Sequence, residues 1–100
     1  MSDRKPARDL SEGTRLANRY TLARRLGRGG AAETWLATDR ITGASVALKI
    51  LVDDRVGSDA LRREWQLAIR LMHAHIVRAF EFHEDDGAFY SLQFIDGPDI

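Results

Sequence analysis

Apolar and polar residues alternate loosely over residues 19–27, whose sequence is RYTLARRLG. In an extended strand, Tyr20, Leu22 and Arg24 would lie on one face and Arg25 on the other. Alternation of this kind is typical of an antiparallel strand with one face exposed to solvent. The pattern therefore predicts a half-exposed strand at this position.

Four further segments have the short, β-branched or aromatic composition of strands. They are ETWLATD at 33–39, VALKILV at 46–52, IVRAFEFH at 76–83 and AFYSLQFI at 88–95. The sequence DRITG marks a turn after the first of these, and Asp86-Gly87 suits a tight hairpin between the last two. These signals predict five strands in all.

Residues 59–72, DALRREWQLAIRLM, carry a helical signal, with Ser58 and Asp59 as candidate N-terminal caps. Apolar residues recur at helical spacing and form one stripe, which consists of Leu61, Trp65, Ala68, Ile69 and Met72. The order of elements predicts an α+β fold, with a five-stranded, mostly antiparallel sheet and one packed helix. We interpret the polar residues 1–15 as a flexible leader.

Composition argues against several classes of partner and site. The 15 basic and 15 acidic residues cancel, so net charge favours neither nucleic acid nor a membrane surface. No apolar run approaches the roughly 18 residues of a membrane helix. The absence of cysteine excludes disulfides and thiolate metal sites, and it fits a protein of the reducing cytoplasm. His73 and His75 have no carboxylate beside them, so we expect no metal site.

A glycine-rich stretch, LGRGGAAET at 26–34, follows the first predicted strand. Glycines in this arrangement let the backbone approach a phosphate group closely. The stretch also fits the dinucleotide-binding pattern GxGxx(G/A), in which residues 31–40 would form a helix and Asp53 would bind a ribose. The glycines alone leave a nucleotide and a dinucleotide as alternatives.

Lys49 lies in the middle of the strand predicted at 46–52, and Ala47 shares its face. A buried parallel strand of a dinucleotide-binding fold would not hold an unpaired ammonium group, because its desolvation is costly. Glu64 lies beside the apolar stripe of the helix and has no cation three or four residues away. We therefore expect Glu64 to pair with Lys49, which favours a nucleotide whose base lies on Ala47.

Four segments, in this order, resemble the N-terminal lobe of the eukaryotic-like Ser/Thr protein kinases of bacteria. LGRGGAAETWLA resembles their glycine-rich loop, and VALKIL resembles the strand with the phosphate-contacting lysine. EWQLAIRLMHAHIVRAFEF resembles the helix with the paired glutamate and the strand after it. YSLQFIDGPDI resembles the last strand and the hinge. The resemblance implies a kinase N-lobe over 16–100 that ends at the hinge, with the C-lobe absent.

The resemblance also implies roles for the matching residues. The implied catalytic residues are Lys49, which would hold the α- and β-phosphates of ATP, and Glu64, which would orient Lys49. The loop over the phosphates would comprise Gly27, Arg28, Gly29, Gly30 and Ala32, where alanine replaces the family's third glycine. Leu26, Thr34 and Ala47 would line the adenine pocket, and Leu92 would guard its back. The backbone of Gln93 and Ile95 would bind the adenine edge, and Asp99 would bind the ribose.

Phosphoryl transfer needs a catalytic aspartate in an H-x-D-x4-N motif and a magnesium-binding aspartate in a DFG motif, and the chain contains neither. The resemblance therefore implies the ATP-binding lobe of a Ser/Thr kinase that acts on a protein substrate. The Mg²⁺ ligands are expected in the C-lobe, and the 100 residues alone are expected to be inactive. The alternatives are a non-catalytic pseudokinase or regulatory nucleotide-binding module and, less favoured, a Rossmann-type dinucleotide-binding domain.

Overall fold

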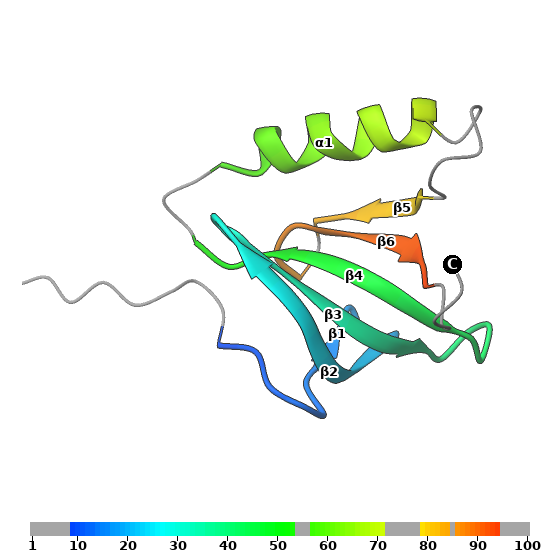
Figure 1. The fold of residues 1–100 in the computed structure, drawn as a ribbon. Helices are drawn as coiled ribbons and strands as arrows, with labels where there is room; N and C mark the ends of the chain where they lie inside the picture. The colour runs from blue at the N-terminus through cyan, green and yellow to red at the C-terminus, as the bar shows by residue number, and fades with distance from the viewer. Residues whose placement is uncertain (1–8, 54–56, 72–78, 85, 95–100) are drawn as a thin grey trace, which may run out of the picture.

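The computed structural model of the chain describes residues 9–53, 57–71, 79–84 and 86–94, and for residues 68–71 it describes the helical backbone alone. These residues form, in order, β1 (Arg15–Leu16), β2 (Tyr20–Gly29), β3 (Ala32–Asp39), β4 (Ser45–Leu51), α1 (Ser58–Leu71), β5 (Ala79–His83) and β6 (Phe89–Gln93). The strands build one antiparallel sheet in the order β1-β2-β3-β4-β6-β5, and α1 lies along one side of it (Figure 1). The predicted α+β arrangement of an antiparallel sheet and a packed helix is confirmed.

The sheet has six strands rather than the predicted five, because β1 adds a short edge strand beside β2. Arg15, which we assigned to the leader, and Leu16 both pair with the start of β2. Leu16 is fully buried, and the turn after it places Ala17 and Asn18 at φ angles of 54° and 52°. Two residues are too few to show an alternating pattern, so periodicity could not reveal this strand.

Two irregularities in β2 change the faces that we predicted for its arginines. Leu22 lies opposite Ala37, whereas Arg24 lies opposite Leu36, so one extra residue, Ala23, is inserted between them. Opposed residues of antiparallel strands share a face, and neighbouring residues of one strand do not. Arg24 therefore lies on the other face from Leu22 and Arg25 on the same face, so the predicted faces are wrong for both arginines. The second irregularity, between Arg25 and Gly27, restores the alternation.

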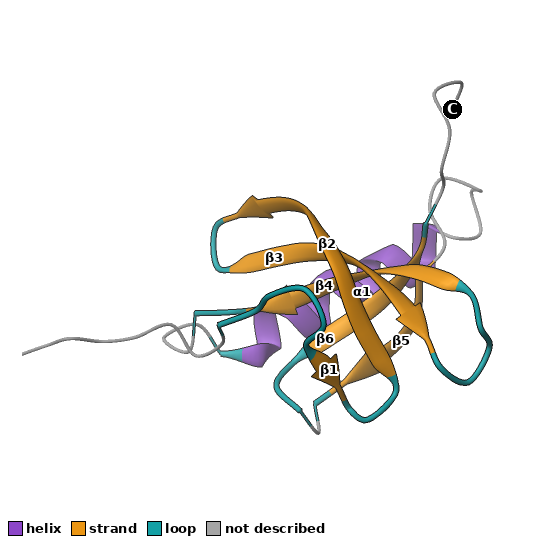
Figure 2. Ribbon diagram, turned by 90° about the horizontal axis from the view of Figure 1, so that it is seen from below, coloured by secondary structure: helices purple, strands orange, loops and turns teal. Residues whose placement is uncertain are grey.

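Apolar side chains form a cluster on each face of the sheet. The buried cluster on one face consists of Leu16, Tyr20, Leu22, Trp35, Ala37, Val46, Leu48, Ile50, Val52 and Phe89. The cluster on the other face, against α1, consists of Leu61, Ala79, Ala88 and Tyr90, with Leu51, Trp65, Phe82 and Leu92 packed around it. Figure 2 shows the twisted strands from below, with the helix behind them. The sheet thus curls around the first cluster and carries the helix over the second.

Side chains near the start of β2 reach across to β5, the strand at the opposite edge of the sheet. Arg19 Nη1 donates a hydrogen bond to Glu81 Oε1 at 2.8 Å. The Tyr20 hydroxyl lies 3.2 Å from His83 Nε2, and the two rings meet edge to face. The curl of the sheet therefore brings the start of β2 near β5.

The predicted helix at 59–72 is confirmed, because α1 runs from Ser58 to Leu71. Of its predicted apolar stripe, Leu61 is buried and Trp65 packs against the second cluster. The side chains of Ala68 and Ile69, and Met72, lie outside the described residues.

The dinucleotide-binding alternative is wrong. It requires a helix over residues 31–40, immediately after the glycine-rich stretch. The structure has β3, Ala32–Asp39, at this place, paired along its length with β2 and β4. The glycine-rich stretch is therefore the tip of a hairpin and does not open a helix.

Candidate functional site

The register of three strands gathers several predicted site residues on the face of the sheet that α1 covers. Thr34 of β3 lies opposite Lys49 of β4, and Lys49 in turn lies opposite Tyr90 of β6. Ala47 of β4 lies opposite Leu92 of β6. Directly opposed residues of antiparallel strands project to the same side. These five residues therefore share one face, which we call the site face.

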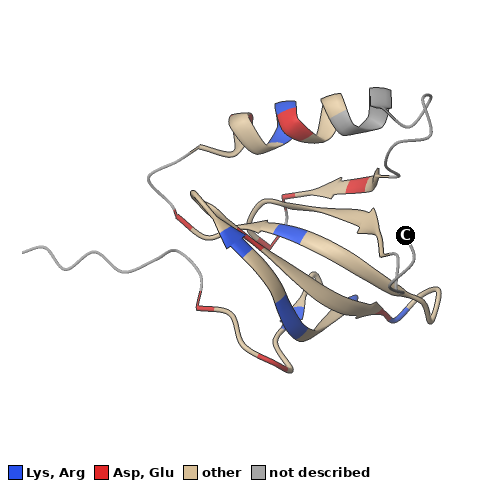
Figure 3. Cartoon of the chain, in the orientation of Figure 1, with Lys and Arg blue, Asp and Glu red and all other residues tan. Residues whose placement is uncertain are grey.

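Glu64 of α1 meets Lys49 on the site face. Glu64 Oε2 lies 2.6 Å from Lys49 Nζ, which confirms the expected contact between these two residues. The side chains of Lys49 and Glu64 are 32% and 42% exposed, so the pair is half-buried and accessible to solvent. Figure 3 shows Lys and Arg positions in blue and Asp and Glu positions in red on α1 as well as on the strands. A pair this exposed contributes only about 0–1 kcal/mol to folding, so stability alone is a weak reason for its presence.

Tyr90 was not among the predicted site residues, yet its hydroxyl donates a hydrogen bond to Glu64 Oε2 at 2.8 Å. Tyr90 is only 3% exposed. Burial raises the pKa of Tyr90, and the hydrogen bond to Glu64 raises the pKa further. The phenol therefore stays protonated and remains a hydrogen-bond donor at neutral pH. Sequence reasoning lacked the register of β4 and β6, which places Tyr90 opposite Lys49.

The glycine-rich stretch forms the turn between β2 and β3. Gly29 lies opposite Ala32, and Gly30 in the turn has a φ of 57°, a conformation that favours glycine. A Cβ added to Gly27 or Gly29 would meet no heavy atom within 4 Å. Gly27 lies opposite Thr34, so this open space adjoins the site face. The turn therefore leaves room for a ligand to approach the backbone.

The side chain of Arg28 lies on the other face of the hairpin. Arg28 is opposite Glu33, and Arg28 Nε lies 3.8 Å from Glu33 Oε2. Arg25 Nη1 lies 3.6 Å from the same oxygen, and Glu33 Oε1 accepts a hydrogen bond from Trp35 Nε1 at 2.9 Å. Glu33, which we did not predict as a site residue, thus connects side chains of β2 and β3 on the face of the hairpin away from the site face. Only the backbone of Arg28 remains a candidate for the phosphate loop.

The other predicted site residues differ in their placement. Leu26 is 36% exposed, and Ala32 is buried on the same side of β3 as Thr34. Gln93 lies opposite Val46, on the face away from Lys49, so its side chain does not join the site face. The two last predicted residues, Ile95 and Asp99, lie outside the described residues.

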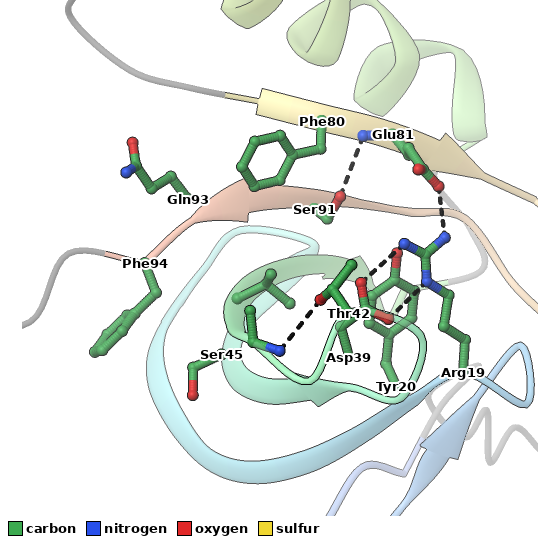
Figure 4. A pocket seen from close by; sticks show the side chains of 12 residues that line it. Arg19, Tyr20, Asp39, Thr42, Ser45, Phe80, Glu81, Ser91, Gln93 and Phe94 are labelled. Atoms are coloured by element: carbon green, nitrogen blue, oxygen red, sulfur yellow. Dashed lines mark hydrogen bonds and ion pairs between the residues drawn. The ribbon is translucent and has the colours of Figure 1, made fainter.

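A cavity of about 500 Å³ lies on the face of the sheet away from Lys49 (Figure 4). Its lining comprises Arg19, Tyr20, Asp39, Thr42, Ala44, Ser45, Val46, Phe80, Glu81, Ser91, Gln93 and Phe94. Arg19 donates to both carboxylate oxygens of Asp39 at 2.8 Å, and these hydrogen bonds lower the pKa of Asp39 to about 2. Arg19 also binds Glu81, so the charged groups of the cavity pair with one another.

The described part of the chain contains no group of three or more His, Cys, Asp or Glu side chains that could hold a metal ion. In the same residues, no helix is long and apolar enough to cross a membrane.

Comparison with known proteins shows a consistent pattern. The chain is 36% identical over 90 residues to the serine/threonine-protein kinase PrkC of Bacillus subtilis, a match that covers 85% of this chain. It is 35% identical over 96 residues, 91% of this chain, to the DNA damage-responsive serine/threonine-protein kinase RqkA of Deinococcus radiodurans. The chain spans 14% of the length of each of these two relatives.

Among solved structures, the PknI kinase domain of Mycobacterium tuberculosis is similar, with a TM-score of 0.66 and 30% sequence identity. That match covers 89% of this chain and 38% of the PknI chain. No protein-family model matches the chain.

Proposed function

Because the chain belongs to the bacterial Ser/Thr protein kinases and matches the N-terminal part of their kinase domain, we propose that its site face binds ATP. The observation that carries the proposal is the Lys49–Glu64 contact, which faces the same side of the sheet as Ala47 and the open glycine turn. A half-exposed ammonium group beside accessible backbone is suited to a polyphosphate anion.

In the proposed complex, the adenine lies against Ala47 and Leu92, the small and apolar side chains that are opposed on the site face. The phosphates extend along the same face toward Lys49 and the turn containing Gly29. Glu64 holds Lys49 by its Oε2 and so keeps the ammonium group in one place. The contacts proposed for Ile95 and Asp99 with the nucleotide rest on resemblance alone.

The reaction proposed for the full protein is transfer of the terminal phosphoryl group of ATP to a Ser or Thr hydroxyl of a protein substrate. The catalytic aspartate and the Mg²⁺ ligands would come from outside these 100 residues, which contain neither an H-x-D-x4-N nor a DFG motif. Mg²⁺ would neutralise charge on the phosphates when bound. The 100 residues alone should therefore bind ATP without transferring phosphate, and the cytoplasm, where ATP is supplied, is the proposed compartment.

Thermal unfolding of the chain with and without ATP and Mg²⁺ tests the binding step. A ligand at a hundred times its Kd stabilises the folded state by about 2.7 kcal/mol, which raises Tm by several degrees. We expect this rise in the wild type and its loss in Lys49→Met, with NAD⁺ as a control that stabilises neither. An equal rise in both proteins, or none with ATP, would show that the site face does not bind ATP.

Phosphate transfer is tested separately, by incubating the full protein with ATP, Mg²⁺ and a protein substrate and locating phosphoserine or phosphothreonine by mass spectrometry. Transfer that Lys49→Met abolishes supports a kinase. Binding of ATP without transfer under any substrate condition would instead support a regulatory nucleotide-binding module.

A further inference from the structure

We propose that Tyr90 is a positioning residue of this site, whose hydroxyl fixes Glu64, and with it α1, where Glu64 can hold Lys49. The functional part of this inference rests on the proposed ATP site, whereas the structural part concerns only the contact between Glu64 and Lys49. Tyr90 is assigned no contact with the nucleotide.

The geometry joins three elements at one atom. Glu64 Oε2 accepts hydrogen bonds from Lys49 Nζ at 2.6 Å and from the Tyr90 hydroxyl at 2.8 Å. Lys49 belongs to β4, Tyr90 to β6 and Glu64 to α1. Lys49 and Tyr90 are opposed in the β4–β6 ladder, so the two donors start from neighbouring backbone positions and reach the same oxygen of Glu64.

Tyr90 is the rigid member of the three. It is 3% exposed and packs in the cluster with Leu61 of α1 and Ala79 of β5. Lys49 and Glu64, in contrast, are long side chains exposed by 32% and 42%. Flexible side chains lose conformational entropy when they are held in one geometry, which is why such pairs are weak in isolation. A buried donor with two torsion angles supplies the constraint that the ion pair lacks.

The chemistry of the contact is that of a neutral donor and a charged acceptor. The pKa of Tyr90 is raised by burial and by the hydrogen bond to the neighbouring carboxylate, so the phenol keeps its proton at neutral pH. The hydrogen bond leaves the negative charge on Glu64, where Lys49 requires it. Loss of the hydroxyl should therefore free Glu64 without changing the charge of the site.

The composition of the chain allows a direct measurement. It contains two lysines, Lys5 and Lys49, and two tyrosines, Tyr20 and Tyr90. Acylation of lysine amines, followed by mass spectrometry, gives the rate at Lys49 with Lys5 as an internal reference. Tyr20→Phe is a matched control, because it also removes a buried hydroxyl, which contacts His83 at 3.2 Å on the other face of the sheet.

We expect Tyr90→Phe to raise the acylation rate of Lys49 about tenfold, as expected for loss of a hydrogen bond to a charged group. Tyr20→Phe should leave the rate unchanged, and Glu64→Gln should raise it as a positive control. An unchanged rate in Tyr90→Phe, or an equal rise in both tyrosine variants, would overturn the proposal. This measurement requires neither ATP nor activity, so its outcome is separable from failure of the proposed function.

In the full protein, Tyr90→Phe should lower kcat about tenfold and leave the KM for ATP within about twofold, since the nucleotide contacts remain. A rise in KM with unchanged kcat would place Tyr90 in nucleotide binding and overturn the positioning role.

Discussion

Lys49 Nζ and Glu64 Oε2 lie 2.6 Å apart although fifteen positions of sequence, including the segment between β4 and α1, separate the two residues. The pair is half-exposed, so we expect its loss to lower the free energy of unfolding little, even if it lowers activity strongly. The ion pair contributes about 0–1 kcal/mol to folding, whereas a charge that stabilises a transition state contributes several times more.

Lys49→Met and Glu64→Gln should therefore lower kcat/KM for phosphoryl transfer by the full protein by about 100-fold or more. The free energy of unfolding should change by less than about 1 kcal/mol. Parallel measurements are steady-state kinetics and chemical denaturation. Glu81→Gln is the control, because Glu81 also forms an exposed ion pair but on β5, with Arg19. Equal losses of activity in all three variants would contradict a specific role for the pair.

Gly29→Val should weaken ATP binding without weakening the fold. A Cβ at Gly29 meets no heavy atom within 4 Å, and valine is favoured in strands, so Tm should stay within about 2 °C of the wild type. The added side chain would occupy the space proposed for phosphates, and the Kd for ATP should rise about tenfold or more, which is ~1.4 kcal/mol.

Gly43→Ala is the matched control for the glycine turn. Gly43 has a φ of 78° in the turn between β3 and β4, so alanine should cost about 1–2 kcal/mol of stability. The Kd for ATP should be unchanged in Gly43→Ala. The opposite result, a stability loss in Gly29→Val with normal ATP binding, would mean that the glycine turn serves folding.

Asp39 should make the free energy of unfolding depend on pH below about pH 4. Its pKa is lowered from 3.8 to about 2 by the hydrogen bonds from Arg19, so the ionised form favours the folded state. The stabilisation, about 2 kcal/mol, is fully present above pH ~4 and is lost as pH falls toward ~2. Asp39→Asn should lower the free energy of unfolding at pH 7 and remove this part of the acid dependence. Glu12→Gln, at an exposed carboxylate, should retain it.

Glu33 should matter to the hairpin mainly as a hydrogen-bond acceptor. Glu33→Gln retains an oxygen for Trp35 Nε1, whereas Glu33→Ala leaves that buried donor unpaired at a cost of about 1–3 kcal/mol. Chemical denaturation, monitored by tryptophan fluorescence, should therefore show that the free energy of unfolding decreases from the wild type to Glu33→Gln and further to Glu33→Ala. If Glu33→Gln were as unstable as Glu33→Ala, the ion pairs with Arg25 and Arg28 would be the dominant contacts.

The contact between Lys49 and Glu64 could be predicted because each residue is a charge on a face that is otherwise small or apolar. The helix and the segments that form β3, β4 and β6 were likewise visible as periodicity or composition. These features depend on neighbours within about ten residues, which the sequence displays directly.

The role of Tyr90 could not be predicted in the same way. β6 rather than β5 pairs with β4. The residue opposite Lys49 therefore comes from the strand that lies farther along the sequence. The bulge at Ala23 is equally hidden, because one inserted residue reverses the faces of Arg24 and Arg25, up to the next irregularity before Gly27, without changing composition. Strand order and register are properties of the assembled sheet.

Contacts of Arg19 with Glu81 and of Tyr20 with His83 link the start of β2 to β5, an outer strand of the sheet. Nearby, the backbone N–H of Ala17, between β1 and β2, donates a hydrogen bond at 2.8 Å to Oδ2 of Asp86, which lies between β5 and β6. Side-chain contacts of this kind, and no ladder of backbone hydrogen bonds between the described strands, join the two ends of the curled sheet. Such contacts screen edge strands that would otherwise invite another chain to add a strand. Because side chains make these contacts, we expect substitution of Arg19 or Tyr20 to loosen the curl of the sheet beneath the site face without breaking a backbone ladder.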